Sequence, residues 1–105
     1  MSAVERFEAI LAGGGDSPSL RFALGTEYMK LAETPRAIEH LRVAVALDPE
    51  FSAAWKLLGK AQTAAGLKKD AAASYREGIR AATQRGDVQA AREMKVFLKR
   101  LQRPA

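Results

Sequence analysis

A pair of lysines one helical turn apart could bind carboxylates. Lys56 and Lys60 are four residues apart, so in a helix both ammonium groups would stand on one face. No catalytic group is comparably placed. The single histidine, His40, lies beside Glu39, where we expect a solvent-exposed side chain, and the sequence has no cysteine. One histidine without a cysteine supports neither a metal site nor a nucleophile.

A run of three glycines, Gly13 to Gly15, precedes the next expected helix. A glycine-rich loop before a helix can cradle a phosphate group. This run is followed by no Gly-Lys-Ser/Thr sequence and preceded by no strand pattern, so we interpret it as a flexible connector. The sequence also lacks paired carboxylates and nucleophile–base spacings. We therefore expect no enzyme activity and no cofactor.

Length and composition favour one small soluble domain. The 105 residues, 48% of them hydrophobic, suffice for a single domain that spans residues 1–105. The absence of cysteine excludes disulfides and thiolate metal sites. No apolar run reaches the length of a membrane span, and the N-terminal sequence does not resemble a signal peptide. We therefore expect a cytoplasmic protein without membrane insertion.

Charge is distributed unevenly along the chain. Residues 1–50 carry five basic and eight acidic side chains, a net charge of −3, whereas residues 51–105 carry twelve basic and four acidic ones, a net charge of +8. This asymmetry favours an acidic partner, a nucleic acid or other anionic surface, or another copy of the chain. Solvated helix faces of no functional consequence would explain it equally well.

Apolar periodicity and helix-start signals predict an all-α protein. Ser2 and Glu5 form a capping-box pattern, and both Ser17–Pro18 and Thr34–Pro35 place a cap residue before a proline. Gly66 is placed to end a helix in the left-handed conformation, and Asp87 to cap the last one. The expected helices cover residues 2–12, 17–32, 35–47, 51–65, 68–84 and 87–102.

A spaced set of large and small residues recurs along the chain. Trp55, Leu58 and Gly59 share one helical face, and Ala71 and Tyr75 form an i, i+4 pair on the next helix. Matching residues stand 34 positions earlier, namely Leu24, Gly25, Ala37 and Leu41. The pattern resembles the tetratricopeptide repeat, a 34-residue antiparallel helix pair with the signature W-x2-L-G-x2-Y…A-x3-F…P.

The resemblance implies a solenoid of helical hairpins. Residues 18–51 would form one repeat and residues 52–85 a second, although Arg21, Gln62 and Thr83 depart from the signature. Residues 2–12 would form the second half of a further repeat. Residues 86–103 keep helical periodicity but lose the core residues, as in the polar terminal helix that repeat arrays need.

The resemblance also implies a function, which is to bind a protein or peptide in a concave groove lined by the first helix of each repeat. Carried over by position, the groove residues are Phe22, Thr26, Met29, Lys30, Lys56, Lys60, Thr63 and Met94. Apolar anchors beside two lysines indicate an acidic, partly apolar peptide. Three alternatives remain. Phe22 could belong to the core instead of the groove. The basic C-terminal half could bind nucleic acid or another anionic surface, although no nucleic-acid motif is present, or the oppositely charged halves could associate in a homo-oligomer.

Overall fold

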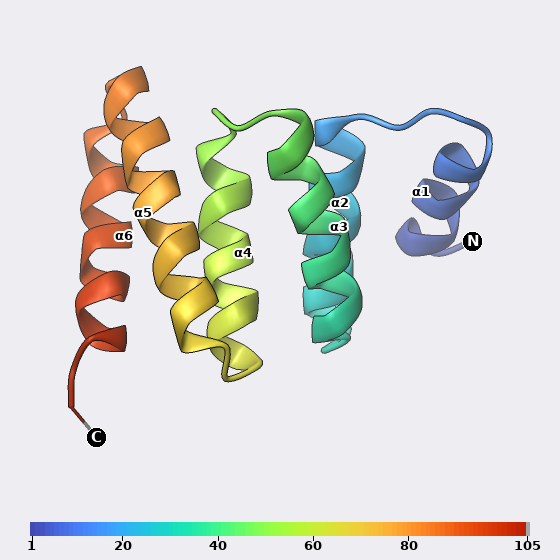
Figure 1. Ribbon diagram of the computed structural model, residues 1–105. Helices are drawn as coiled ribbons and strands as arrows, with labels where there is room; N and C mark the ends of the chain where they lie inside the picture. Colours follow the sequence, from blue (N-terminus) through green and yellow to red (C-terminus); the bar gives the residue numbers. More distant parts are fainter. Residues whose placement is uncertain (105) are drawn as a thin grey trace.

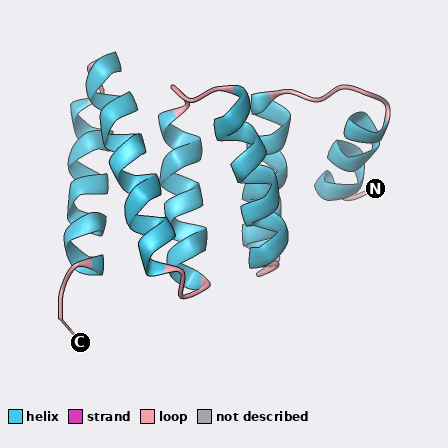
Figure 2. Cartoon of the chain, viewed as in Figure 1, coloured by secondary structure: helices cyan, strands magenta, loops and turns pink. Residues whose placement is uncertain are grey.

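Residues 1–104, which the computed structural model describes, form six α-helices and no strand (Figure 2). The helices are α1 (Ala3–Ala12), α2 (Pro18–Lys30), α3 (Thr34–Leu47), α4 (Ser52–Ala64), α5 (Lys68–Arg85) and α6 (Val88–Leu101). The expected all-α architecture is confirmed, and each helix end lies within two residues of its expected position.

The helices stack side by side in the order of the sequence (Figure 1). Helices α2 and α3 form one antiparallel hairpin and α4 and α5 a second, while α1 lies against α2 and α6 against α5. The result is an elongated body of 43 × 31 × 19 Å. Helix α2 also touches α4, and α4 touches α6, so these three helices share one side of the stack.

Two glycines allow the helices of each hairpin to approach closely. A Cβ atom added at Gly25 would lie 2.5 Å from Cγ of Leu41, and one added at Gly59 would lie 2.5 Å from Cε1 of Tyr75. Both distances are shorter than carbon atoms tolerate. Gly25 and Gly59 hold the same position in successive repeats, as do Leu41 and Tyr75, so the same contact recurs in both hairpins.

The buried side chains form two clusters along the stack. The larger cluster joins α2, α3 and α4, and three half-buried residues of α1 pack against it: Val4, Phe7 and Leu11. The smaller cluster joins α5 and α6 through Ala71, Tyr75, Ala82, Ala91 and Met94. Helix α1 has no fully buried residue, so it is the helix least anchored by apolar burial.

Side-chain caps start three of the helices as expected. Ser2 and Glu5 form a complete capping box, because each accepts a hydrogen bond from the backbone N–H of the other. The Ser17 hydroxyl accepts from the N–H of Leu20, and Pro18 occupies the first helical position. The Asp87 carboxylate caps α6. These caps satisfy donors that a helix start leaves free.

The expected cap at Thr34 is wrong. Helix α3 begins at Thr34 itself, and the preceding residue, Glu33, makes no side-chain cap bond. The cause lies in the turn, where the N–H of Glu33 donates to the carbonyl oxygen of Tyr28 and Ala32 adopts a positive φ of 58°. The turn between α2 and α3 therefore ends one residue earlier than expected, and Thr34 is the first residue of α3.

The turn between α4 and α5 has the same geometry with a different residue. Gly66, which holds the position of Ala32 in the next repeat, has a φ of 78° and ends α4 as expected, and the N–H of Leu67 donates to the carbonyl oxygen of Gln62. Glycine enters this left-handed region without the steric cost that alanine incurs. Ala32 is therefore strained where Gly66 is not.

Enlarging Ala71 is expected to destabilise the fold, because Ala71 is a fully buried residue of α5. Overpacking such a contact costs about 1–3 kcal/mol, so Ala71→Leu should lower the melting temperature measured by circular dichroism. Ala73→Leu is the matched control, since Ala73 is exposed on the same helix. Equal melting temperatures for the two variants would contradict this account of the helix contact.

Exchanging the two turn residues should have opposite effects. Ala32→Gly should stabilise the protein, because relief of a left-handed alanine is worth up to about 1–2 kcal/mol, less the entropy that glycine adds to the unfolded chain. Gly66→Ala should destabilise it for the same reason. Urea unfolding of both variants measures the difference, and a change of the same sign in both would disprove the shared turn geometry.

Candidate functional site

Two neighbouring hollows run along the side formed by α2, α4 and α6. The first, which we term the α2–α4 hollow, has a volume of about 290 Å³, and the second, the α4–α6 hollow, about 350 Å³. Both are lined by Ala53 and Lys56 of α4, so together they form one groove. Their volumes lie at the lower end for small-molecule pockets, which suits single side chains of a bound segment.

The α2–α4 hollow has an apolar floor with polar edges. Phe22 and Leu57 line it, and the half-buried ring of Phe22 packs against the ring of Phe51 with centroids 4.9 Å apart. Thr26 contributes a hydroxyl that donates to the carbonyl oxygen of Phe22. Phe22 packs against the larger core cluster and also lines the groove, so groove and core are not exclusive alternatives for this side chain.

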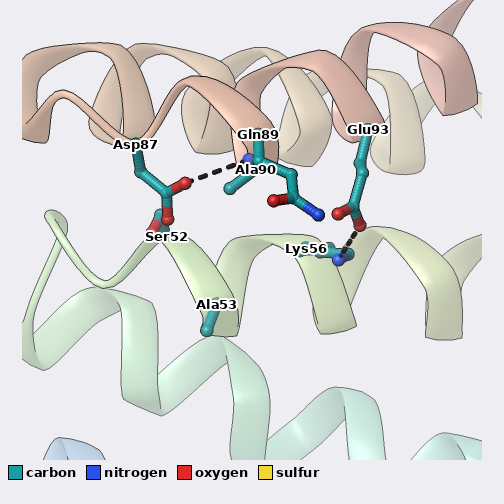
Figure 3. Close-up of a pocket in the computed structure, with 7 residues that line it drawn as sticks. All are labelled: Ser52, Ala53, Lys56, Asp87, Gln89, Ala90 and Glu93. Atoms are coloured by element: carbon teal, nitrogen blue, oxygen red, sulfur yellow. Dashed lines mark hydrogen bonds and ion pairs between the residues drawn. The ribbon is translucent and has the colours of Figure 1, made fainter.

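The α4–α6 hollow is lined mainly by residues with polar or charged side chains and contains an ion pair (Figure 3). The Lys56 ammonium of α4 donates to the Glu93 carboxylate of α6, whose side chain points down toward α4 in the close-up. The nearby Asp87 carboxylate accepts from the N–H of Ala90, so it acts as the cap of α6. Glu93 is thus the carboxylate that faces the lysine of the groove.

The two groove lysines act on the Glu93 carboxylate together. The pKa of Glu93 is lowered, first by the hydrogen bond from Lys56 and by the charge of Lys56, and to a smaller extent by the charge of Lys60. The Lys60 ammonium lies 5.3 Å from the centroid of the Phe97 ring, in cation–π contact. The two lysines therefore favour the charged form of the carboxylate that stands beside Lys56.

The structure brings together four of the eight residues expected in the groove, namely Phe22, Thr26, Lys56 and Lys60. Three others lie outside both hollows. Met29 packs against the larger core cluster, Lys30 is exposed and pairs with Glu27, and the Thr63 hydroxyl donates to the carbonyl oxygen of Gly59. These three continue α2 and α4 beyond the hollows.

The expectation for Met94 is corrected. Its side chain is fully buried in the cluster between α5 and α6, against Gly78. Among the described residues of α6, Ala91 and Met94 are the buried ones, and they lie three positions apart on the face that packs against α5. An adaptable thioether fills the space beside a glycine. Met94 is therefore part of the core and does not line the groove.

Sequence reasoning missed several residues of the groove. Leu57 and Ala53 belong to the floor, and Gln89 and Glu93 line the end at α6. Glu93 carried a usable signal, because it holds in the last unit the position that Gly59 holds in the second repeat, where the signature has a small residue. A long acidic side chain cannot be buried there, so it had to reach solvent or a cation.

His40 is buried rather than exposed, which corrects the expectation for it. Only 7% of its surface is accessible, and its Nδ1 lies 3.0 Å from Nη1 of Arg21, which can only donate. Its Nε2 lies 3.3 Å from a Glu8 oxygen, which also accepts from the Tyr28 hydroxyl, and the His40 and Tyr28 rings stack. This polar network joins α1 to α2 and α3, and the sequence spacing of its members does not reveal it.

Within residues 1–104, the structure holds no group of three side chains suited to bind a metal ion. Over the same residues, none of the helices is long and apolar enough to cross a membrane.

Comparison with known proteins shows relatives along nearly the whole chain. No family model matches the sequence. The chain is 46% identical over 100 residues to the TPR repeat-containing protein PA0015 of Pseudomonas aeruginosa, covering 95% of both chains.

Solved structures give the same result. Protein BPP2914 of Bordetella parapertussis is similar with a TM-score of 0.81 and 42% identity, over 96% of this chain and 88% of that one. A tetratricopeptide repeat domain protein of Salinibacter ruber, in its crystal structure, has a TM-score of 0.76 and 25% identity, over 83% of this chain and 97% of that one. Given the close relative and the shared fold, the chain belongs to the tetratricopeptide repeat proteins, a family whose members serve generally as protein–protein interaction modules.

Proposed function

We propose that the groove of α2, α4 and α6 binds a segment of another protein that carries acidic and apolar side chains. The observation that supports this most directly is the ion pair of Lys56 with Glu93, because in it the groove lysine already takes a carboxylate as its partner. The apolar floor formed by Phe22 and Leu57 adjoins the same lysine. An apolar side chain of the ligand would occupy the α2–α4 hollow.

The dimensions of the groove set the spacing of the ligand's side chains. Packed helices lie about 8–10 Å apart, and an extended chain advances about 3.3 Å per residue. An apolar side chain at Phe22 and an acidic one near Lys56 at the next helix are therefore expected roughly three residues apart in the bound segment.

In the same proposal, the repeats run over residues 18–51 and 52–85, with the half-repeat 2–12 before them and the capping helix 86–103 after them. The recurrence of the close contacts at Gly25 and Gly59 supports these boundaries. The groove then consists of the first helix of each successive unit, together with the capping helix.

Selection of displayed random peptides tests the proposal. Wild-type protein should enrich peptides with an acidic residue about three positions from an apolar one, since an extended chain spans about 8–10 Å, the usual distance between packed helices, in roughly three residues. Replacing both groove lysines, as Lys56→Gln with Lys60→Gln, should abolish the acidic preference. The control is Lys68→Gln with Lys69→Gln, which removes the same charge from exposed positions in the first turn of α5.

The control also separates this function from binding of polyanions by the basic C-terminal half. General attraction would weaken as much in the Lys68/Lys69 variant as in the groove variant, and would fall steeply with salt for any polyanion. Enrichment of the same peptides by all three proteins would refute the proposed groove.

A further inference from the structure

We propose that the Glu93 carboxylate acts as an internal competitor, which occupies the acidic position of the groove and must leave Lys56 before a ligand carboxylate can bind there. This inference rests on the proposed function and adds a control of affinity that the chain itself supplies. It assigns to Glu93 a role in specificity, since only ligands with a carboxylate gain from its displacement.

The contact is placed where a ligand would need it. Lys56 lines both hollows, so any segment that follows the groove from α2 to α6 passes its ammonium group. Glu93 reaches this lysine from another helix, 37 residues further along the chain. Figure 3 shows the two side chains meeting across the hollow.

The pair can open without disturbing the fold. The Lys56 side chain is 26% exposed and that of Glu93 39%, so an incoming carboxylate reaches the ammonium from solvent. Helix α6 is held by the buried side chains of Ala91 and Met94, which contact the α5 cluster and not the groove. Release of Glu93 therefore leaves α6 in place.

The two lysines that act on the Glu93 carboxylate are the same two that are proposed to attract the carboxylate of the ligand. Both groove lysines lower the pKa of Glu93, Lys56 by a hydrogen bond and by its charge and Lys60 by its charge alone. Glu93 stands at the repeat position that Gly25 and Gly59 occupy in the two preceding units. Those glycines admit a neighbouring helix, whereas here a glutamate extends into the groove.

An NMR titration of the full chain tests the inference with two defined peptides. The first is acetylated, amidated Phe-Ser-Ser-Glu-Asp, which has its apolar and acidic residues three apart, and the second is its neutral counterpart Phe-Ser-Ser-Gln-Asn. Glu93→Gln should bind the acidic peptide roughly two- to fivefold more tightly than wild type, the range that loss of a competing exposed ion pair allows. Its affinity for the neutral peptide should not change.

A matched control removes the effect of net charge. Glu50→Gln also removes an ion pair between elements, that of Glu50 with Arg80 at 3.0 Å, and raises the net charge by the same amount. It should leave both affinities unchanged because Glu50 lines neither hollow. In a Lys56→Gln background, Glu93→Gln should give no gain.

Each contrary result has a distinct meaning. Equal gains in Glu93→Gln and Glu50→Gln, or equal affinities of wild type and Glu93→Gln, would overturn the role of Glu93 while leaving the acidic ligand in place. If no form shifts its groove amide signals with the acidic peptide at millimolar concentration, the proposed function fails and this inference fails with it. Amide spectra away from the groove report whether each variant is folded.

Discussion

Close approach of paired helices at glycine is the constraint on which the rest of the structure depends. The Leu41 side chain lies directly over the backbone of Gly25, and the Tyr75 ring lies over that of Gly59 in the same way. Side chains at either glycine would hold the hairpin helices apart and open voids in a densely packed interior. Because the contact recurs from one repeat to the next, successive hairpins keep one geometry, and their first helices align along one side.

The alignment of α2, α4 and α6 places two hollows side by side, and these hollows form the groove proposed to bind a ligand. Some residues of α2 and α4 that stay outside the core line the groove, where Phe22 and Leu57 supply apolar area and Lys56 supplies charge. A lysine between two hollows can cover apolar surface with its stem while its ammonium group pairs with a carboxylate, as that of Lys56 does with Glu93. Packing thus fixes where the groove lies, and the residues left outside the core decide what it can bind.

The sequence was sufficient for the helices, and four of the eight residues expected in the groove do line one hollow. The 34-residue period predicted the helix contacts at Gly25 and Gly59, because residues at the same position of successive repeats have equivalent neighbours, here Leu41 and Tyr75. Met94 and His40 were misplaced for a different reason. The rotation of α6 and the docking of α1 depend on contacts between distant residues, such as Met94 with Gly78 and His40 with Glu8, and a local pattern carries no information about them.

The attachment of α1 has a consequence for the way this solenoid comes apart. Repeat arrays gain stability mainly between neighbours, so a terminal unit opens at lower free energy than the middle. Helix α1 follows this rule strongly, because it buries no residue completely and a run of three glycines connects it to α2. Its amide protons should exchange with solvent before those of any other helix, through detachment of the Glu8 carboxylate from Tyr28 and His40, while the two hairpins remain folded.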